Sequence, residues 1–447
     1  MAEPKRHSVE RSLRDYARAE KLIPGATQLI SRRPARMAYG VSPIYADHAK
    51  GSHFWDVDGN EYIDWISGIL AIILGYADEV VDNAVKEQIG KGVTFSINHE
   101  LELELAEELI RTIPSAEMVR YAKGGGDACT IAVRIARGTT GRDKVLFCGY
   151  HGWHDWYIAA NLLEDATLDE HLFPGIDPTG VPKALAGTIF PFRYGDLEML
   201  EQRLEENKGE VACIIMEPLR SELPPKGFLE GVRALADRYG VVLIFDEVSC
   251  GFRIALGGAQ EYLGVTPDIS VFAKALSNGY SMGAVVGKRD VMEPASRMFI
   301  SSTYWSDTIG IVAALTTIRE LRRRGAVEHF FKAGRTIKQG LDQAIRDTGI
   351  PAHAFGLDCY PRFQFDIADP ALHQKVSTLY VQEMCKRGIF SATYFTLNMA
   401  HSEEDMAGTV AASKEVFGLI QSALERGHVD DLLEAELRTD TFRRMVR

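Results

Sequence analysis

Cysteine is scarce in this sequence, and none of it occurs in the CxxC spacing of redox motifs and zinc sites. The six cysteines stand at positions 129, 148, 213, 250, 359 and 385. Several lie inside apolar runs, where a free thiol behaves as a small hydrophobic group. This usage excludes a disulfide framework and predicts a reducing compartment, the cytoplasm.

Long apolar runs and an excess of positive charge are also missing. Nowhere do 18 apolar residues follow one another, and the amino terminus has no apolar segment of signal-peptide length. The net charge is −12 and the pI is about 5.6, which argues against nucleic acid or an anionic membrane surface as the main partner. Local basic pockets for an anionic ligand stay compatible with this balance.

The length of the chain bounds its architecture. A chain of 447 residues exceeds what one hydrophobic core usually supports, so we expect one large domain and a smaller lobe. Local patterns predict helices over residues 8–23, 82–90 and 100–112, and a hairpin turn at Asp58-Gly59. No internal repeat or low-complexity tract is present.

Two charged residues follow apolar runs in the central stretch of the chain. Val241–Phe245 leads into Asp246 and its neighbour Glu247, and Ile269–Ala273 leads into Lys274. Such runs predict strands buried on both faces, and in open α/β sheets ligands gather beyond the carboxyl ends of the strands. A crossover connection can therefore bring Asp246 and Lys274 side by side, although they are 28 positions apart.

This pair suits one kind of cofactor chemistry. A lysine near apolar groups loses part of its preference for the ammonium form, so its amine can attack a carbonyl. A pyridoxal phosphate (PLP) enzyme needs such a lysine on the cofactor aldehyde and an aspartate that keeps the ring nitrogen protonated. In the alternative interpretation, Asp246 caps a helix or pairs with Arg253, and Lys274 is an ordinary surface residue; the pair alone leaves both open.

Glycines and an aromatic residue follow two further predicted strands. The strand Met118–Ala122 leads into the glycines at 124–126 and a helix, whose first amides suit a phosphate, although the glycines can also form a plain tight turn. The strand Lys144–Cys148 leads into Tyr150, a flat face for stacking on a ring. His151 and a second histidine at 154 suggest a metal pair, but no further ligands follow at zinc spacing, so we expect no metal.

The segment DEVSCGFRIALGGAQEYLGVTPDISVFAKALSNG, residues 246–279, resembles the signature of the class III aminotransferases, PLP enzymes of fold type I. It is most similar to the branch that includes glutamate-1-semialdehyde 2,1-aminomutase. The resemblance implies an α/β fold: a large domain with a mostly parallel seven-stranded sheet and a small α+β domain. Residues 76–325 would form the large PLP-binding domain, and residues 1–75 and 326–447 the small one.

The resemblance also implies the roles of individual residues. Lys274 would form the Schiff base and Asp246 would contact the pyridine nitrogen. The other residues expected to bind the cofactor are Gly125 and Gly126 at its phosphate, Tyr150 and Val248 on the ring faces, and Glu217 beside them. Ser302 and Thr303 would reach the phosphate in the opposite subunit, which implies a homodimer with shared active sites.

Two arginines are candidate ligands for a substrate carboxylate. By resemblance, Arg32 takes this role, although the adjacent Arg33 leaves the register open by one residue. Arg220 follows the strand at 211–217. It is either a carboxylate-binding residue that the family pattern lacks or a surface arginine.

The expected reaction is the transfer of an amino group from an amino acid donor, glutamate, to a small ketone such as a cyclic carboxylated one. The alternative is the aminomutase reaction, which gives 5-aminolevulinate. Two departures from the aminomutase favour the first reaction: Ser67–Leu70 replaces Gly-Ser-Trp-Gly, and residues 391–399 replace the Phe-Glu-Ala-Gly region. A decarboxylase, a racemase or a regulatory protein that binds the cofactor is a third, different class.

Overall fold

The computed structural model describes residues 7–164, 167–220 and 222–441, and the chain forms two compact units. Unit 1 comprises Met1–Asp78 and Glu328–Arg447, and unit 2 comprises Glu79–Val327. Within the described ranges, no helix combines the length and the apolar character that crossing a bilayer requires.

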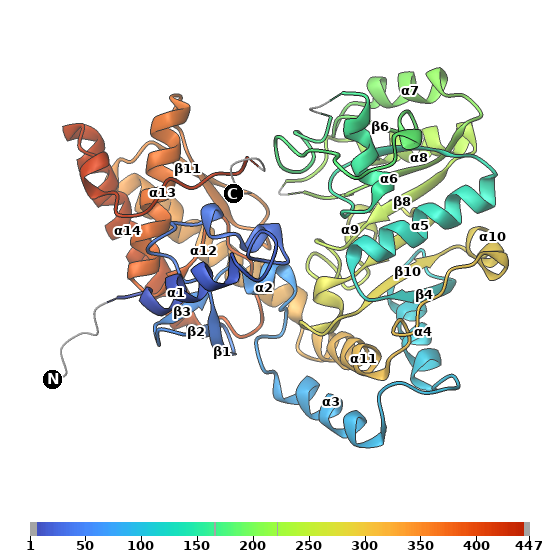
Figure 1. Ribbon diagram of the computed structural model, residues 1–447, viewed down its shortest axis with the longest axis horizontal. Coiled ribbons are helices and arrows are strands. Elements are labelled where there is room, and N and C mark those ends of the chain that lie inside the picture. Colours follow the sequence, from blue (N-terminus) through green and yellow to red (C-terminus); the bar gives the residue numbers. More distant parts are fainter. Residues whose placement is uncertain (1–6, 165–166, 221, 442–447) are drawn as a thin grey trace. The chain divides into compact units, whose positions relative to one another are not determined.

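Unit 2 is built on a seven-stranded sheet with the strand order β4-β10-β9-β8-β7-β5-β6 (Figure 1). The strands are β4 (Met118–Ala122), β5 (Lys144–Cys148), β6 (Ile189–Pro191), β7 (Val211–Met216), β8 (Val242–Asp246), β9 (Ile269–Phe272) and β10 (Gly283–Gly287). Strand β10 is antiparallel to β4 and β9, and the other neighbours are parallel. The mostly parallel seven-stranded sheet is therefore confirmed.

The central strands of this sheet explain the apolar runs in the sequence. Every residue of β7, β8 and β9 is buried, as expected for parallel strands that are covered on both faces. Helix α5 (Gly125–Thr140) packs across β4 and β7–β10, and α8 (Phe228–Tyr239) packs against β8 and α7 (Leu197–Glu206) (Figure 1). The polar residues that follow the strands thus stand on a rigid base.

The remaining helices of unit 2 surround this base. They are α3 (Glu79–Lys91), α4 (Leu101–Thr112), α6 (Asp155–Ile158), α9 (Ala259–Leu263), α10 (Arg289–Met292) and α11 (Thr308–Arg323). The helices predicted at 82–90 and 100–112 correspond to α3 and α4, and their bounds differ from the predicted ones by at most three residues.

Unit 1 joins the two ends of the chain in one sheet of order β1-β2-β3-β13. Its strands are β1 (Ala46–Lys50), β2 (His53–Asp56), β3 (Glu61–Asp64) and β13 (Ile389–Phe390), and a separate ribbon contains β11 (Ala352–Phe355) and β12 (Arg362–Phe365). Strand β13 runs parallel to β3, and the turn at Asp58-Gly59 joins β2 and β3 as predicted.

The helices of unit 1 are α1 (Glu10–Ala19), α2 (Ser67–Leu70), α12 (Ala326–Thr348), α13 (Pro370–Lys386) and α14 (Glu403–Arg426). Helix α1 is shorter than the predicted 8–23. It ends at Ala19, and turns and a bend occupy the residues between it and Pro24.

Candidate active site

Four neighbouring parallel strands of unit 2 end at one edge of the sheet, and each carries a candidate site residue there. Strand β5 is followed by Tyr150 and His151, β7 by Glu217 and β9 by Lys274, while β8 ends in Asp246. Parallel strands present their carboxyl ends together, so residues that lie far apart in the sequence meet at this edge.

The Asp246 carboxylate is buried and accepts three hydrogen bonds. Its Oδ2 lies 2.8 Å from His151 Nδ1 and 3.4 Å from the Cys129 thiol, and its Oδ1 accepts from the Val248 amide at 3.0 Å. Burial, and then the charge of Asp246, raise the pKa of the Cys129 thiol well above its usual value, so the thiol stays protonated and donates. These donors stabilise a charged carboxylate in a fixed orientation.

His151 and Cys129 are site residues that sequence reasoning missed. His151 was considered only as a metal partner of His154, whereas its Nδ1 contacts Asp246. The ligand atoms of Cys129, His151 and Asp246 lie within 4.8 Å of one another, and hydrogen bonds to the shared carboxylate explain this grouping. One signal was available: His151 lies just beyond the carboxyl end of β5, and Asp246 lies at the carboxyl end of β8.

The other acid of the central pair has a structural role. Glu247 is buried and accepts from the Ala259 and Gln260 amides at 2.8 and 3.0 Å, at the start of α9. The helix-capping role that was considered for Asp246 therefore belongs to Glu247. The Asp246 carboxylate is therefore not used to cap a helix and can contact a ligand at the edge of the sheet.

Lys274 is partly buried, and its Nζ donates to Ser249 Oγ at 2.9 Å. Burial lowers the pKa of Lys274, and Arg253 adds to this effect, while the charges of Asp246 and Glu217 oppose it. The backbone of Lys274 has a φ of 48°, a left-handed conformation that a residue with a Cβ rarely adopts. Strain of this kind is frequent at functional sites, and the lowered pKa increases the share of neutral, nucleophilic amine.

Glu217 lies beside the tyrosine that follows β5. Its Oε2 accepts from the Tyr150 amide at 3.3 Å and lies 3.7 Å from Arg220 Nε. Burial, and then the charge of Asp246, raise the pKa of Glu217. Gly149 has a φ of 117°, and a Cβ there would lie 2.5 Å from Glu217 Oε2, so this turn requires glycine.

The amino-terminal end of α5 fits an anion. Gly125 and Gly126 are its first two residues, and the first amides of a helix have no partner within the helix. A Cβ on Gly125 would lie 2.9 Å from Val248 Cγ1, and a Cβ on Gly126 would lie 3.3 Å from His154 Cε1. Side chains at these two positions would crowd the approach to the amides, so the glycines keep it open next to Val248.

The remaining candidates from the sequence are exposed, except for Arg33. Tyr150 is 42% exposed, and Ser302 and Thr303 are exposed in the segment before α11. In unit 1, Arg32 is exposed, whereas Arg33 is buried and packs against Gly25. Of the two adjacent arginines, Arg32 is thus the accessible one.

A lysine of lowered pKa, a buried charged carboxylate and a helix start that suits a phosphate are the parts that a PLP enzyme uses. The chain belongs to the class-III aminotransferase family, whose profile matches residues 36–351. It is therefore a PLP-dependent aminotransferase, and the residues at the strand ends fit that cofactor.

Comparisons with individual proteins agree with this assignment. The chain is 38% identical, over 93% of its length and 98% of the relative's, to 3-aminobutyryl-CoA aminotransferase of Cloacimonas acidaminovorans (strain Evry). It is 34% identical, over 90% and 96% of the two chains, to glutamate-1-semialdehyde 2,1-aminomutase of Syntrophobacter fumaroxidans. A solved transaminase with PLP bound superposes with a TM-score of 0.82 at 26% identity, over 93% and 98% of the two chains.

Proposed function

We propose that this protein transfers an amino group between two separate molecules, from an amino acid donor, glutamate, to a small keto acceptor. The observation that carries the proposal is the pairing of a triply hydrogen-bonded Asp246 with a Lys274 of lowered pKa at adjacent strand ends. PLP, when bound, supplies an aldehyde and an electron-withdrawing ring. The residues of the chain bind and orient the reacting molecules and move the protons.

Each residue of the site has a defined task in this proposal. Lys274 holds the cofactor through Nζ and afterwards moves the proton between the substrate α-carbon and the cofactor. Asp246 keeps the ring nitrogen protonated. The Gly125 and Gly126 amides bind the phosphate, Val248 and Tyr150 contact the ring faces, and Glu217 orients the neighbouring groups. Arg32 and Arg220 bind substrate carboxylates.

The segment that departs from the aminomutase pattern supports a different substrate. Ser67–Leu70 forms a left-handed turn with φ values between 47° and 66°. The buried Asp64 holds this turn through the Ile66 and Gly68 amides at 2.8 and 3.2 Å and through the Tyr76 hydroxyl at 2.6 Å. By the resemblance, this segment lies around the substrate, and we infer that its departure from the aminomutase pattern changes which acceptor the enzyme takes.

The acceptor has two candidates of different chemistry. One is the small, for example cyclic, carboxylated ketone. The other is a 3-oxoacyl thioester, because a relative with 38% identity is a 3-aminobutyryl-CoA aminotransferase. The relative that is an aminomutase, at 34% identity, keeps intramolecular transfer as the second candidate function.

We also propose a cytoplasmic homodimer that shares its active sites. Ser302 and Thr303 lie near Phe299 and Tyr304, which are 83% and 64% exposed. Exposed aromatic groups of this size are typical of surfaces that a partner covers. The cysteines are free and buried, which agrees with a reducing compartment.

The test is a set of half-reaction spectra with purified protein and a panel of donors and acceptors. The proposal expects glutamate to convert the bound cofactor from its aldehyde to its amine form, and one acceptor to reverse this change. Lys274→Ala should lose both the lysine-bound absorbance and turnover, while Lys208→Ala, a control at an exposed lysine, should keep both. Full activity of Lys274→Ala contradicts the proposal. Formation of 5-aminolevulinate from the semialdehyde without added donor favours the aminomutase.

A further inference from the structure

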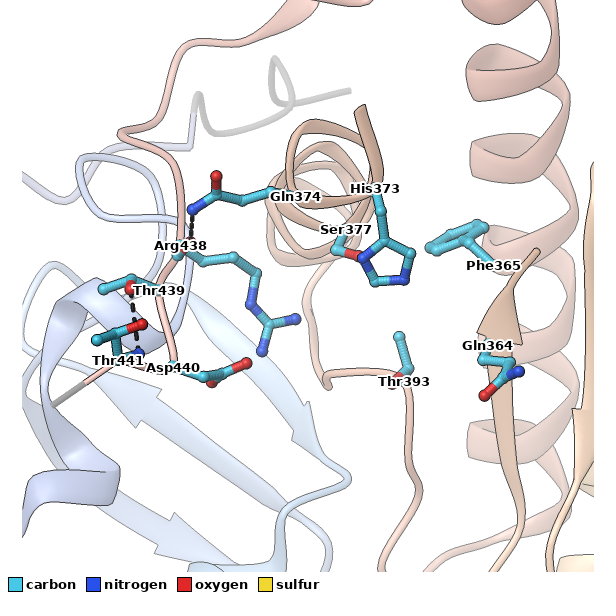
Figure 2. Close-up of a pocket in the computed structure, with 10 residues that line it drawn as sticks. All are labelled: Gln364, Phe365, His373, Gln374, Ser377, Thr393, Arg438, Thr439, Asp440 and Thr441. Carbon is cyan, nitrogen blue, oxygen red and sulfur yellow. Dashed lines mark hydrogen bonds between the residues drawn. The ribbon is translucent and has the colours of Figure 1, made fainter. Parts of the chain in front are cut away.

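Unit 1 contains a cavity of about 400 Å³ whose lining includes none of the candidate site residues named above (Figure 2). It lies between α13, strand β12 and the segment Arg438–Thr441. Its lining is mainly polar and includes Gln364, His373, Ser377 and Thr393. A volume of this size suits a small ligand, and the polar lining excludes a purely apolar one.

The segment before this cavity is fixed along one face of α13. Gln374, Thr378 and Gln382 recur every four residues, and all three bind the backbone of residues 432–438. Gln382 Nε2 donates to the Leu432 carbonyl at 2.8 Å, and Thr378 Oγ1 accepts from the Arg438 amide at 3.1 Å. The backbone of Arg438 is thus held in place before any ligand binds.

Figure 2 shows the Arg438 side chain extending away from Gln374 and into the cavity. Gln374 Nε2 donates to the Arg438 carbonyl at 2.7 Å, but in the part of the chain that the structure describes no hydrogen bond or ion pair holds the guanidinium. Burial lowers the pKa of Arg438; the charge of Asp440 opposes this effect, and the nearby Arg36 adds to it. A half-buried cation in this environment gains from an anionic partner.

The cavity lining contains one arginine and one carboxylate, Arg438 and Asp440, and two further arginines act on Tyr394, the residue that follows Thr393 of the lining. Burial raises the pKa of Tyr394, and the charges of Arg36, Arg438 and Arg362 oppose that rise. The Arg362 guanidinium lies 5.6 Å from the Tyr394 ring centroid. Two carboxylates lie among these groups. Asp440 lies 3.2 Å from Arg36, and Asp64 acts on Tyr394 but already accepts a hydrogen bond from Tyr76.

We propose that this cavity binds the phosphoryl group of a small molecule, with Arg438 as its principal ligand. A planar guanidinium donates two parallel hydrogen bonds to phosphate oxygens, which suits Arg438 as a phosphate ligand. The Ser377 and Thr393 hydroxyls, both at the cavity, supply further donors. Because the Arg438 backbone is fixed beforehand, binding loses little conformational entropy there.

The phosphoryl group has two sources that share this chemistry. It belongs either to a phosphate-bearing acyl thioester substrate, the class of the second acceptor candidate, or to a separate phosphorylated effector. Only the first source rests on the proposed function. The binding site itself does not, because Lys274 and the α5 terminus belong to the other unit.

The test measures inorganic phosphate and coenzyme A binding by calorimetry, with full-length protein saturated with PLP so that the α5 site is filled. Arg438→Gln should weaken phosphate binding about tenfold or more, as expected for the loss of a charge-assisted pair. Arg346→Gln, a control at an exposed arginine that pairs with Asp342, should bind as the unmodified protein does. Asp440→Asn should bind phosphate more tightly, because it removes a competing negative charge.

Unchanged binding by Arg438→Gln, or no binding by the unmodified protein at millimolar phosphate, overturns the proposal. Should Arg438→Gln unfold, Arg438→Lys keeps the charge and should bind with intermediate affinity. A KM for a 3-aminoacyl-CoA that rises in Arg438→Gln, with an unchanged KM for the free 3-amino acid, identifies the substrate as the source. Unchanged KM values together with weaker phosphate binding identify an effector. If the protein has no aminotransferase activity but still binds phosphate through Arg438, the proposed function is refuted and the phosphate-binding site is supported.

Discussion

Removal of the Ser249 hydroxyl should lower the pKa of Lys274 beyond the effect of burial. Lys274 Nζ donates to Ser249 Oγ at 2.9 Å, and this bond is stronger when the amine carries its proton. Hydrogen bonds to charged groups contribute about 1.5–3 kcal/mol. Since about 1.4 kcal/mol corresponds to a factor of ten, Ser249→Ala should raise the neutral fraction of the amine about 10- to 100-fold at a pH below its pKa.

The assay follows the reaction of Lys274 with PLP in the cofactor-free protein from neutral to alkaline pH. The rate of absorbance change reports the neutral amine, so its midpoint in Ser249→Ala should move to lower pH. Ser249→Thr keeps the hydroxyl and is the matched control, with a midpoint close to that of the unmodified protein. A midpoint in Ser249→Ala that stays in place or moves to higher pH refutes the assigned role of this hydrogen bond.

Three further predictions concern buried groups. Because the pKa of Glu217 is raised in the folded protein, stability should be lost as the pH rises through that pKa, and Glu217→Gln should remove this loss in thermal unfolding scans at several pH values. Burial lowers the pKa of His401 from 6.5 to about 4, so stability is present above pH 6.5 and lost as the pH falls towards 4. His401→Gln should flatten this loss, worth up to about 3 kcal/mol, in denaturant titrations; an equal slope in both proteins contradicts it. Gly149→Ala should lower the melting temperature and weaken PLP binding, since its Cβ would meet Glu217 Oε2 at 2.5 Å and its left-handed backbone costs about 1–3 kcal/mol; unchanged values in both measurements count against this.

The elements that sequence analysis located well are those whose pattern is local. Strands Met118–Ala122 and Lys144–Cys148 have the predicted bounds, because polar or glycine residues follow each of them directly. The antiparallel β10 was not predicted, since its run of small residues, Gly283–Gly287, has neither alternation nor clear boundary signals. One of its two neighbours, β4, comes from a distant part of the chain.

The candidate site divides in a similar way. The positions of Asp246 and Lys274 at strand ends follow from the sequence, because each comes directly after an apolar run. The sequence also showed that Ser67–Leu70 differs from the aminomutase pattern. It did not show that the backbone of these residues is left-handed. That conformation depends on the buried Asp64, which accepts from Gly68 and Tyr76, and on the Ser67 hydroxyl, which donates to the Thr396 carbonyl at 2.7 Å.

By itself, the sequence determined the α/β class, the strand-end acid and amine, and the cofactor chemistry that they serve. Only the tertiary structure decided which groups surround that pair. His151 and Cys129 contact Asp246 across 95 and 117 positions of sequence, and Arg438 reaches its cavity through a segment bound along α13. Contacts of this kind depend on the order of strands in the sheet and on the path of the chain between them, which hydrophobic periodicity does not encode.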